Sequence, residues 1–326
     1  MNNFWTTLNS PFFALAPMED VTDVAFREMF ARHSHSNPVF FTEFVSVDGI
    51  VYSKSNDREK LFSKLLFTKK QRPIVAQVFG AKPNNFIKAL NEIKSFGFDG
   101  VDINMGCPDR SVERQGAGAA LIKTPDIAKE IITNSRSFLG EDMPLSVKTR
   151  IGYNAPQIEE WIGLLLSLNL DALTIHLRTR KEMSLVPAHW EFGQEILKMR
   201  NKISPKTKII LNGDIISLKD GENKCLNTGA DGVMIGRGVF GNPSFFAQYE
   251  EDNRSVEEKI NQLIEHIKLF DKFLFSKGYK GFYVMKKHFK AYINGWNGAK
   301  ELRIALMETT SPESAIKILK EVLKEK

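Results

Sequence analysis

One cysteine of the chain lies where a predicted strand runs into a glycine-rich loop. The segment 100–104, GVDIN, alternates apolar and polar residues as a short strand does, and the residues MGCP that follow break the pattern. Cys107 therefore stands just past the C-terminal end of a strand, where α/β barrels and doubly wound sheets keep their active sites. A thiol there could take part in catalysis. The alternative is that Cys107 is a small buried apolar residue, as free cysteines usually are, and the loop alone leaves both interpretations open.

Side chains that can donate hydrogen bonds gather at the ends of other predicted strands. Each of them alone could be a structural residue, but their shared position at strand ends favours a polar site. The residues concerned are Gln77 in the third strand, Lys148 and Arg150 at the end of the fifth, and His176 and Arg178 at the end of the sixth, with the loop Ala16, Pro17 and Met18 after the first. Such donors could stabilise the carbonyl and N1 edge of a flat, electron-accepting ring.

Two further loops have the composition of a phosphate site. Asn212-Gly213-Asp214 follows the seventh predicted strand, and Gly236-Arg237-Gly238 follows the eighth, where barrel enzymes often bind phosphate through backbone N–H groups. Asn212-Gly213 could instead form a hairpin turn, but helices are predicted on both sides of it. A ring site combined with a phosphate site favours flavin mononucleotide (FMN). The glycine-rich segment 116–120 lacks the βαβ context of a dinucleotide fingerprint, so we expect no dinucleotide-binding domain.

Eight strands alternating with helices over about 240 residues predict a (β/α)8 TIM barrel, with a doubly wound sheet as the alternative. The helix and strand signals include Gly97 and Gly229 after helices and Thr124-Pro125 before one. The clearest helices are expected at Asn84–Phe96, Pro125–Phe138, Pro156–Leu168 and Leu218–Thr228. The strands are expected at Phe13–Ala16, Val39–Phe44, Ile74–Val78, Gly100–Asn104, Leu145–Thr149, Ala172–His176, Lys208–Leu211 and Gly232–Ile235.

The last quarter of the chain has a different pattern, with apolar residues at helical spacing and no convincing strand. We therefore divide the chain into a catalytic barrel, residues 1–247, and a small all-helical C-terminal domain, residues 248–326. From Glu251 to the end, fifteen Lys and Arg face eleven Asp and Glu, which is most of the chain's net charge of +6. A surface that binds RNA could use the cluster Lys286, Lys287 and Lys290, interleaved with the aromatic residues Phe282, Tyr283, Phe289 and Tyr292. The alternative, which we favour for the aromatic residues, is that they face inward from an amphipathic helix.

Composition excludes several classes of protein. Two cysteines, Cys107 and Cys225, cannot form a disulfide framework and are too few for an all-cysteine iron–sulfur cluster or zinc site, so we expect no metal. No apolar run is long enough to span a membrane, and the N-terminal segment lacks the pattern of a signal peptide. We expect a cytoplasmic protein that is a monomer and has no membrane partner.

Seven ordered motifs over nearly the whole chain resemble the tRNA-dihydrouridine synthases. They are LAPMEDVTDVAFR (15–27), AQVFGAKP (76–83), DINMGCPDRSVERQGAGAALI (102–122), VKTRIG (147–152), IHLRTR (175–180), NGDI (212–215) and GADGVMIGRG (229–238). The tail MKKHFKAYINGWNGAKELR (285–303) resembles the helical domain with which that family grips tRNA. The resemblance implies an FMN-dependent barrel enzyme that reduces selected tRNA uridines to 5,6-dihydrouridine, with NADPH as the usual reductant.

The same resemblance implies roles for individual residues. Cys107 would be the general acid that protonates uracil C5 while the reduced flavin delivers hydride to C6. The cofactor-binding positions would be Ala16, Pro17, Met18, Gln77, Lys148, His176, Asn212, Gly213, Asp214, Gly236 and Arg237. The substrate-binding positions would be Asn104, Arg150, Arg178, Lys286, Lys287 and Lys290. For this chemistry the Cys107 thiol must stay protonated, so its surroundings should not lower its pKa much.

Two other functions remain open on the sequence. One is an FMN barrel that acts on a free small molecule, such as dihydroorotate or a free pyrimidine, although it leaves the basic helical tail without a use. The other is an RNA-binding scaffold whose barrel has lost catalysis, which the presence of Cys107, Lys148 and Arg237 disfavours. The sequence does not indicate which uridine is reduced, or whether NADH can replace NADPH.

Overall fold

The computed structural model describes residues 3–35, 37–247 and 252–324. Parallel strands form one sheet in the order β1-β9-β8-β7-β6-β5-β4-β2, with β3 also paired to β4. The strands are β1 Phe12–Leu15, β2 Phe40–Phe41, β3 Val45–Ser46, β4 Ile74–Phe79, β5 Gly100–Met105, β6 Leu145–Arg150, β7 Ala172–His176, β8 Lys208–Asn212 and β9 Gly232–Ile235.

The sheet closes into a barrel. Strand β1 pairs with β9 on one side, and on the other a β-bridge joins Ala14 to Val39, just before β2. The backbone bonds there are Leu15 N to Val39 O and Val39 N to Phe13 O, both 2.9 Å. Closure confirms the predicted TIM barrel, and the doubly wound alternative is wrong because that sheet would stay open.

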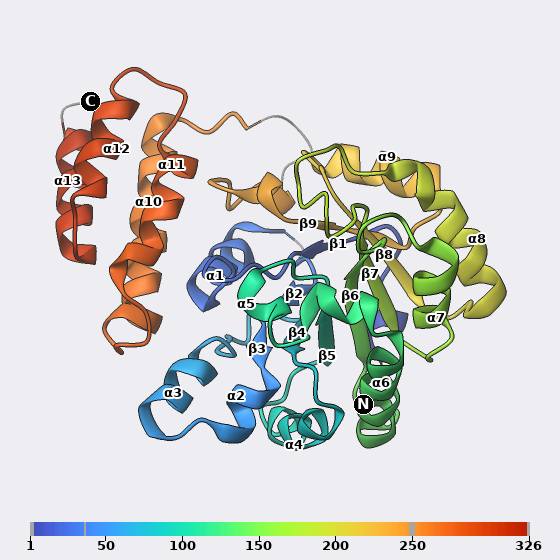
Figure 1. The fold of residues 1–326 in the computed structure, drawn as a ribbon. Coiled ribbons are helices and arrows are strands. Elements are labelled where there is room, and N and C mark those ends of the chain that lie inside the picture. Colours follow the sequence, from blue (N-terminus) through green and yellow to red (C-terminus); the bar gives the residue numbers. More distant parts are fainter. Residues whose placement is uncertain (1–2, 36, 248–251, 325–326) are drawn as a thin grey trace.

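Helices surround the barrel and stand beside it (Figure 1). Around the barrel are α1 Val24–His33, α2 Val47–Tyr52, α3 Ser55–Ser63, α4 Pro83–Lys94, α5 Arg110–Glu113, α6 Pro125–Leu139, α7 Gly163–Leu166, α8 Gly193–Ile203 and α9 Leu218–Thr228. The C-terminal region contains α10 Val256–Phe270, α11 Lys286–Tyr292, α12 Ala299–Met307 and α13 Pro312–Lys324. Short 3₁₀ helices lie at Phe4–Thr6, Gly118–Lys123, Trp190–Phe192, Arg237–Val239, Phe245–Ala247 and Phe282–Met285, and π-helical turns at Ile158–Ile162 and Asp271–Phe275.

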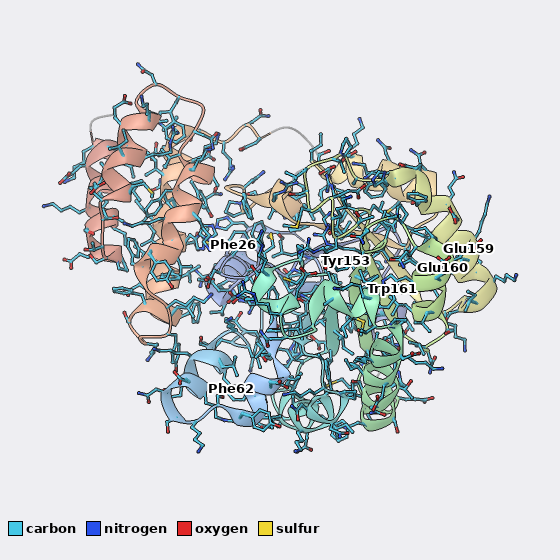
Figure 2. All side chains as sticks on the ribbon, viewed as in Figure 1. Phe26, Phe62, Tyr153, Glu159, Glu160 and Trp161 are labelled. Carbon is cyan, nitrogen blue, oxygen red and sulfur yellow. The ribbon has the colours of Figure 1, made fainter. Side chains whose placement is uncertain are left out.

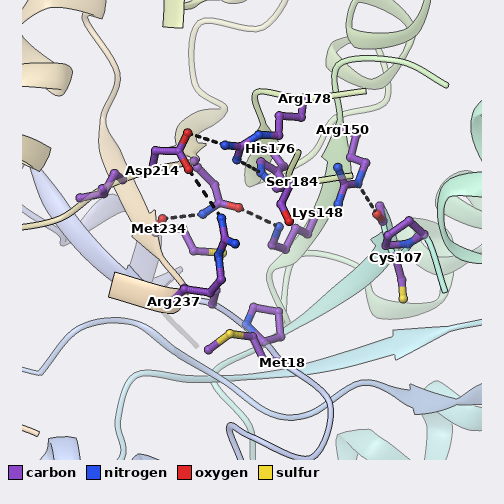
Figure 3. A pocket seen from close by; sticks show the side chains of 18 of the residues that line it. Met18, Cys107, Lys148, Arg150, His176, Arg178, Ser184, Asp214, Met234 and Arg237 are labelled. Atoms are coloured by element: carbon purple, nitrogen blue, oxygen red, sulfur yellow. Dashed lines mark hydrogen bonds and ion pairs between the residues drawn. The ribbon is translucent and has the colours of Figure 1, made fainter. Parts of the chain in front are cut away.

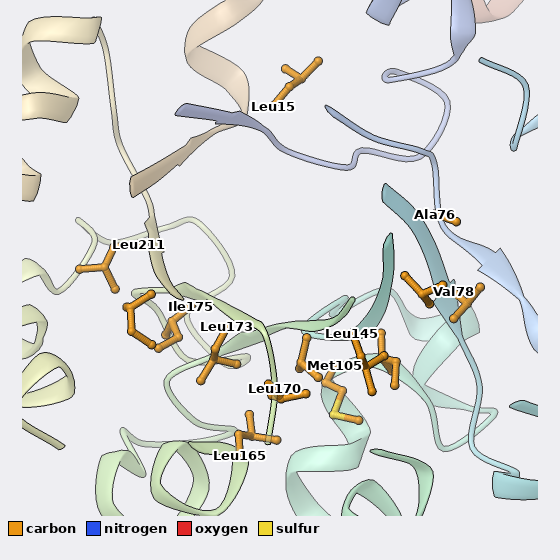
Figure 4. Close-up of a cluster of buried hydrophobic side chains, with 14 of the residues drawn as sticks. Leu15, Ala76, Val78, Met105, Leu145, Leu165, Leu170, Leu173, Ile175 and Leu211 are labelled. Carbon is orange, nitrogen blue, oxygen red and sulfur yellow. The ribbon is translucent and has the colours of Figure 1, made fainter. Parts of the chain in front are cut away.

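Strand alternation divides the barrel into an apolar shell and a layered interior. On β5, Val101, Ile103 and Met105 belong to the large cluster between strands and helices, part of which Figure 4 shows. The intervening Asp102 and Asn104 therefore point into the barrel. A separate apolar layer that includes Trp5 and Phe12 fills one end of the interior, below the polar residues. The polar site is thus built at the opposite, C-terminal end of the strands.

Two predicted elements differ from the structure. The strand expected at Val39–Phe44 covers only Phe40–Phe41 in the structure (β2), and β3 lies beyond it at Val45–Ser46. Between the two, the Thr42 side chain accepts the Gln77 N–H (3.0 Å) in place of a backbone carbonyl. The helix expected at Pro156–Leu168 is instead a π-helical turn followed by the four-residue α7, so its first and last residues lie outside helix. The helix at Leu218–Thr228 has the predicted bounds and ends at Gly229, where φ is 80°.

The C-terminal helices pack on one another and on α1. Their common apolar cluster includes Val24, Ala25 and Met29 of α1 together with residues of α10 to α13. Phe26 of α1, labelled in Figure 2, contacts the rings of His266 and His288, at centroid distances of 5.7 and 5.3 Å. Helix α1 therefore shares its core with both parts of the chain. The division predicted between residues 247 and 248 falls at the edge of 248–251, outside the described residues.

Candidate active site

A cavity of about 620 Å³ opens at the C-terminal ends of the barrel strands. Figure 3 shows its two sides, with Cys107 on one and Asp214 and Arg237 on the other. The predicted residues that line it are Ala16, Pro17, Met18, Asn104, Cys107, Lys148, Arg150, His176, Arg178, Asn212, Gly213, Asp214, Gly236 and Arg237. Its volume lies within the range of cofactor pockets. The residues predicted at the strand ends therefore do lie together, although Ala16 and Arg237 are 221 positions apart in the chain.

The loop after β5 holds Cys107 at the cavity wall. Its backbone N–H and that of Gly106 both donate to Asn104 Oδ1, at 2.9 and 3.1 Å, and its carbonyl accepts from Ala119 N at 2.9 Å. Gly118 has φ of 61°, and a Cβ there would lie 2.7 Å from the Cys107 carbonyl oxygen. The glycine-rich sequence thus lets the following segment close over the cysteine.

The Cys107 thiol is half-buried, and its surroundings favour the protonated form. Burial raises the pKa of Cys107 above its ordinary value, and this outweighs the opposing effect of Arg150. Arg150 is occupied by the protein: Nε donates to Gly106 O (2.8 Å), and Nη1 donates to Thr179 O (3.0 Å) and Met183 O (2.9 Å). It therefore ties the cysteine loop to the loop after β7. The thiol has the protonation state that a general acid needs.

Across the cavity, Lys148 and Asn212 form a pair of polar groups. Lys148 Nζ donates to Asn212 Oδ1 (3.3 Å), and Asn212 Nδ2 donates to Met234 O (2.6 Å), which fixes the orientation of the amide. Burial lowers the pKa of Lys148 to about 8. The lysine is still mostly charged at neutral pH, and it can donate to an anionic ring edge placed in the cavity.

His176 and Arg178 are coupled through the ring of the histidine. Burial, with the nearby Arg150 and Lys148, lowers the pKa of His176 well below its ordinary value, so the ring is neutral. Arg178 Nη1 lies 3.0 Å from His176 Nε2. Since a guanidinium can only donate, Nε2 accepts and the ring proton is on Nδ1. His176 is therefore a neutral donor through Nδ1.

Asp214 connects this pair to the predicted phosphate loops. Its Oδ2 accepts from Arg178 Nη2 and from Ala188 N (2.9 Å), while its Oδ1 lies 3.7 Å from Arg237. Burial raises the pKa of Asp214, but these hydrogen bonds and charges outweigh burial and lower it overall. Arg178 is buried and committed to these contacts, whereas the Arg237 side chain is 64% exposed. Arg237 is the guanidinium available to an incoming anion.

The two phosphate loops need their glycines for close packing. Gly213 has φ of 140°, and a Cβ there would lie 2.6 Å from the Ala188 side chain. At Gly238 a Cβ would lie 2.4 Å from the Ile215 carbonyl oxygen. The backbone at the cavity rim is thus compact, with Arg237 between two close-packed turns. Positive charge, glycine backbone and the ring-edge donors Lys148, His176 and Asn212 fit a planar ring with a phosphate tail.

The structure places four predicted residues away from the cavity. Gln77 is fully buried in the barrel beneath it. Lys287 and Lys290 are exposed on α11, while Lys286 Nζ donates to Met307 O at 2.6 Å and is held within the helical region. The lining also includes residues that were not assigned to the site from the sequence, among them Phe44, Ser184, Ile216 and Met234. Ile216 directly follows a motif that was recognised, but Ser184 comes from a long loop without any motif.

Three of the four aromatic residues near the lysine cluster point inward, as favoured from the sequence. Phe282, Phe289 and Tyr292 are at most 3% exposed, whereas Tyr283 is 72% exposed. Tyr283, Lys287 and Lys290 follow one another at spacings of four and three residues, so they share one face of the helical segment. The exposed face (Tyr283, Lys287, Lys290) is the part of the cluster that is accessible to a partner.

Between this face and the barrel, Lys280 enters a group of carboxylates. Its Nζ donates to Glu43 Oε1 (2.6 Å) and Asp20 Oδ1 (3.1 Å), and Glu43 Oε1 also accepts from Asp20 N (2.7 Å). Glu19, Asp20 and Glu43 have oxygens close enough together to hold a cation. Here the Lys280 ammonium pairs with Asp20 and Glu43, and the Lys64 ammonium pairs with Glu19. Burial lowers the pKa of Lys280, but Glu43 and Asp23 outweigh it and raise the pKa overall.

Comparison with known proteins gives a consistent result. A family model described as dihydrouridine synthase (Dus) matches residues 14–326. A protein of Staphylococcus aureus (strain COL) named probable tRNA-dihydrouridine synthase is 39% identical over 320 residues, covering 98% of this chain and 95% of that protein. A protein of Bacillus subtilis (strain 168) named probable tRNA-dihydrouridine synthase 2 is 40% identical over 318 residues, covering 97% and 95%.

Solved structures with little sequence similarity share the fold. Histamine dehydrogenase from Rhizobium sp. 4-9 superposes with a TM-score of 0.52 at 12% identity, over 79% of this chain and 48% of that one. A 2-naphthoyl-CoA reductase superposes with a TM-score of 0.54 at 11% identity, over 72% and 49%. The chain spans about half of each of these proteins, and the likeness concerns the barrel fold alone. No described helix has the length and apolar character needed to cross a membrane.

Proposed function

Because this chain belongs to the dihydrouridine synthase family and is thus an enzyme that forms dihydrouridine, we propose that it reduces uridines of tRNA to 5,6-dihydrouridine, with FMN as cofactor and NADPH as reductant. The observation that carries the proposal is the cavity with a protonated thiol on one side and ring-edge donors and Arg237 on the other. A bound flavin would supply the hydride for uracil C6. The chain's own residues supply the positioning and the proton.

Each side of the cavity has a task in this proposal. Lys148, His176 and Asn212 would hold the polar edge of the flavin, and Arg237 with the loops at Gly213 and Gly236 would hold its phosphate. Hydride addition at C6 builds negative charge on C5 and the C4 oxygen of uracil, so the barrier stays high unless an acid delivers a proton. Cys107 is the acid that we assign, giving its thiol proton to C5.

The substrate must be a nucleotide that can leave its stack, since a base within a helix cannot reach a cavity inside a barrel rim. Extruding the base costs a few kcal/mol, which favours a loop or bent position in the RNA. The exposed face (Tyr283, Lys287, Lys290) lies on the helical region next to the barrel, and Lys287 is near enough to Asp20 to lower the pKa of that carboxyl. It would bind phosphates and a base of the same tRNA outside the cavity.

Mapping dihydrouridine in tRNA from cells with and without this protein tests the proposal. We expect the modification to disappear from a defined set of positions and to return when the gene is restored, but not when the restored gene encodes Cys107→Ala. An unchanged map would contradict the proposed substrate. Retention of tRNA, but not of uridine, by the FMN-loaded protein would further separate a tRNA enzyme from one that acts on a free pyrimidine.

A further inference from the structure

A row of buried polar side chains runs beneath the cysteine loop, inside the barrel, and the proposed chemistry does not account for it. Asp102 and Asn104 come from β5, Gln77 from β4 and Ser146 from β6. All four are at most 6% exposed, and Asp102 is fully buried. Placing a carboxylate inside a barrel costs free energy, so its contacts need an explanation.

The four side chains form a directed series of hydrogen bonds. Ser146 Oγ donates to Asp102 Oδ1 (2.6 Å), and Gln77 Nε2 donates to Asp102 Oδ2 (2.7 Å). Gln77 Oε1 accepts from Asn104 Nδ2 (3.0 Å). Asn104 Oδ1 then accepts the backbone N–H groups of Gly106 and Cys107, at 3.1 and 2.9 Å. We call the part of this series that leads from the carboxylate to the loop the Asp102 relay (Asp102, Gln77, Asn104); Ser146 is a further donor to Asp102 outside the relay.

The direction of the Asp102 relay follows from the chemistry of its first member. An ionised carboxylate can only accept, so the Gln77 amide must turn its NH₂ group toward Asp102 and its oxygen toward Asn104. Asn104 must then turn its own NH₂ group toward Gln77, which leaves its oxygen for the loop. With the opposite amide orientation, Asn104 would present donors to the donors of Gly106 and Cys107, and two buried bonds would be lost.

We propose that Asp102 is a positioning residue whose carboxylate orients Gln77 and Asn104 and thereby fixes the backbone that presents the Cys107 thiol. Its effect on the loop stands on the observed contacts, while its effect on catalysis rests on the proposed function. The four bonds that make up the relay join β4 and β5 to the start of the cysteine loop. Asp102 lies outside the cavity lining, and a change at Asp102 reaches Cys107 through Asn104, which is part of that lining.

The surroundings of Asp102 make the relay sensitive to pH. Burial raises the pKa of Asp102 to about 6, against the lowering effects of Ser146, Gln77 and Lys148. Of the strands packed around it, β6 contributes the charged Lys148 and β4 the uncharged Gln77. A protonated Asp102 can donate to Gln77 Oε1, which permits the reversed orientation. The loop is therefore held best above about pH 6 and less well as the pH falls through that value.

The full-length protein labelled with ¹⁵N-cysteine tests the relay directly, because its only two cysteines give two amide signals. We expect the Cys107 amide signal to shift with a midpoint near pH 6, while that of Cys225, in α9, stays unchanged. In Asp102→Asn the titration should be lost, and exchange of the Cys107 amide proton with solvent should be about tenfold faster, as for the loss of one buried hydrogen bond. Ser146→Ala, which removes a donor to the same carboxylate but leaves the relay intact, is the matched control.

Gln77→Met interrupts the relay without changing its carboxylate, and it should also abolish the titration of the Cys107 signal. This second variant decides the matter if Asp102→Asn does not fold. A Cys107 signal that titrates equally in Gln77→Met, or a Cys107 amide proton that exchanges no faster in Asp102→Asn than in the wild type, would overturn the proposal. The absence of dihydrouridine from wild-type reactions would instead overturn the proposed function, so the two failures are distinguishable.

The effect of the Asp102 relay on catalysis is tested by single-turnover reduction of tRNA uridine, measured across pH in the wild type and the variants. We expect wild type to lose rate below about pH 6, and Asp102→Asn to be slower throughout without that acid limb and with an unchanged Kd for tRNA. Ser146→Ala should keep an acid limb, moved to higher pH because the Ser146 hydrogen bond lowers the pKa of Asp102. If Asp102→Asn only destabilised the protein, FMN binding and tRNA binding would be lost together. If the acid limb of the wild type persists in Asp102→Asn, the positioning role of Asp102 is contradicted.

Discussion

The thiol of Cys107 combines two properties that are rarely found together, access to a cavity and a raised pKa. Reactive cysteines are usually activated as thiolates by nearby positive charge. Here Arg150 is close, but its donors are directed at backbone carbonyls and burial of the thiol outweighs its field. The result is a group suited to giving a proton rather than to attacking a carbon atom.

Replacing this thiol isolates its contribution. We expect Cys107→Ala to retain FMN and tRNA binding but to lose about 10²- to 10⁴-fold in the rate of dihydrouridine formation, the usual contribution of a general acid. Quantification of dihydrouridine by mass spectrometry in single-turnover reactions checks this. Cys225→Ala, which removes the other, buried cysteine, is the control and should keep the wild-type rate. A wild-type rate in Cys107→Ala would remove the thiol from the mechanism.

The lowered pKa of Lys148 predicts how FMN affinity changes with pH. Because its pKa is lowered to about 8, the ammonium is present below that pH and is lost as the pH rises through it. FMN affinity should therefore weaken above about pH 8. Because the bound FMN anion stabilises the Lys148 ammonium, the loss of affinity is smaller than full loss of that charge would give. Titrating the deflavinated protein with FMN, followed by flavin fluorescence, measures this. Lys148→Met should bind FMN more weakly at neutral pH, and its FMN affinity should not change near pH 8. If the wild type and Lys148→Met show the same dependence of FMN affinity on pH, Lys148 does not contact the flavin.

Much of the site could be predicted because strand ends of a barrel converge. Cys107, Lys148, His176 and Arg237 could be assigned to one cavity because each lies near or just past the C-terminal end of a strand. The direction of a side chain within the barrel could not be predicted in the same way. Gln77 has the expected strand position, yet Asp102 draws its amide into the interior below the cavity.

At the scale of elements, the loop after β1 and the segment between β2 and β3 are held by a lysine from far along the chain. Lys280 lies in the turn before the 3₁₀ helix at Phe282–Met285, and its side chain is 7% exposed against a fully buried Glu43. The loop that it holds continues into Met18, at the cavity wall. The same contact therefore ties the helical region to the site.

Removing this lysine should leave a buried carboxylate without its partner. We expect Lys280→Met to lower the free energy of unfolding by about 3–5 kcal/mol, as when one member of a buried ion pair is deleted. Urea denaturation followed by circular dichroism measures this. The exposed Lys277→Met should change stability little, and Lys280→Met combined with Glu43→Gln should recover part of the loss. A loss below about 1 kcal/mol, the usual range for a surface pair, would show that the contact is weak.

The early end of the strand predicted at Val39–Phe44, which stops at Phe41, belongs to the same feature. Alternation and β-branched or aromatic residues predicted one strand, and nothing local marks the break after β2. The interruption depends on the Thr42 hydroxyl meeting the Gln77 N–H and on Glu43 turning toward Lys280, which is 237 residues away. Contacts of that range are invisible to a pattern read along the chain.

At the scale of the whole molecule, the helical region is fixed to the barrel through α1 as well as Lys280. The apolar cluster that unites α1 with α10 to α13 makes large independent movement of the helices costly. The orientation of the exposed face (Tyr283, Lys287, Lys290) relative to the cavity is thus set by packing. A tRNA gripped by that face would offer the same nucleotide to the cavity each time.

The salt dependence of tRNA binding distinguishes Lys287 and Lys290 of the exposed face from the neighbouring Lys286. Replacing Lys287 and Lys290 by Ala should weaken tRNA binding and reduce the slope of log K against log salt concentration by about 1.4–1.8, at 0.7–0.9 per released counterion. Filter binding at several salt concentrations measures it. Lys286→Ala should change the slope less, because its ammonium is bonded to Met307 O. An unchanged slope in the double variant would place the RNA surface elsewhere.

The most direct test of the account is a reaction in vitro with purified protein, FMN, NADPH and an unmodified tRNA transcript, analysed by nucleoside mass spectrometry. We predict uridine that has gained two hydrogens at a defined position of the tRNA, formed only when all components are present. If the flavin is reduced by NADPH and tRNA is bound, yet no dihydrouridine is formed, the assignment of this cavity to uridine reduction is contradicted.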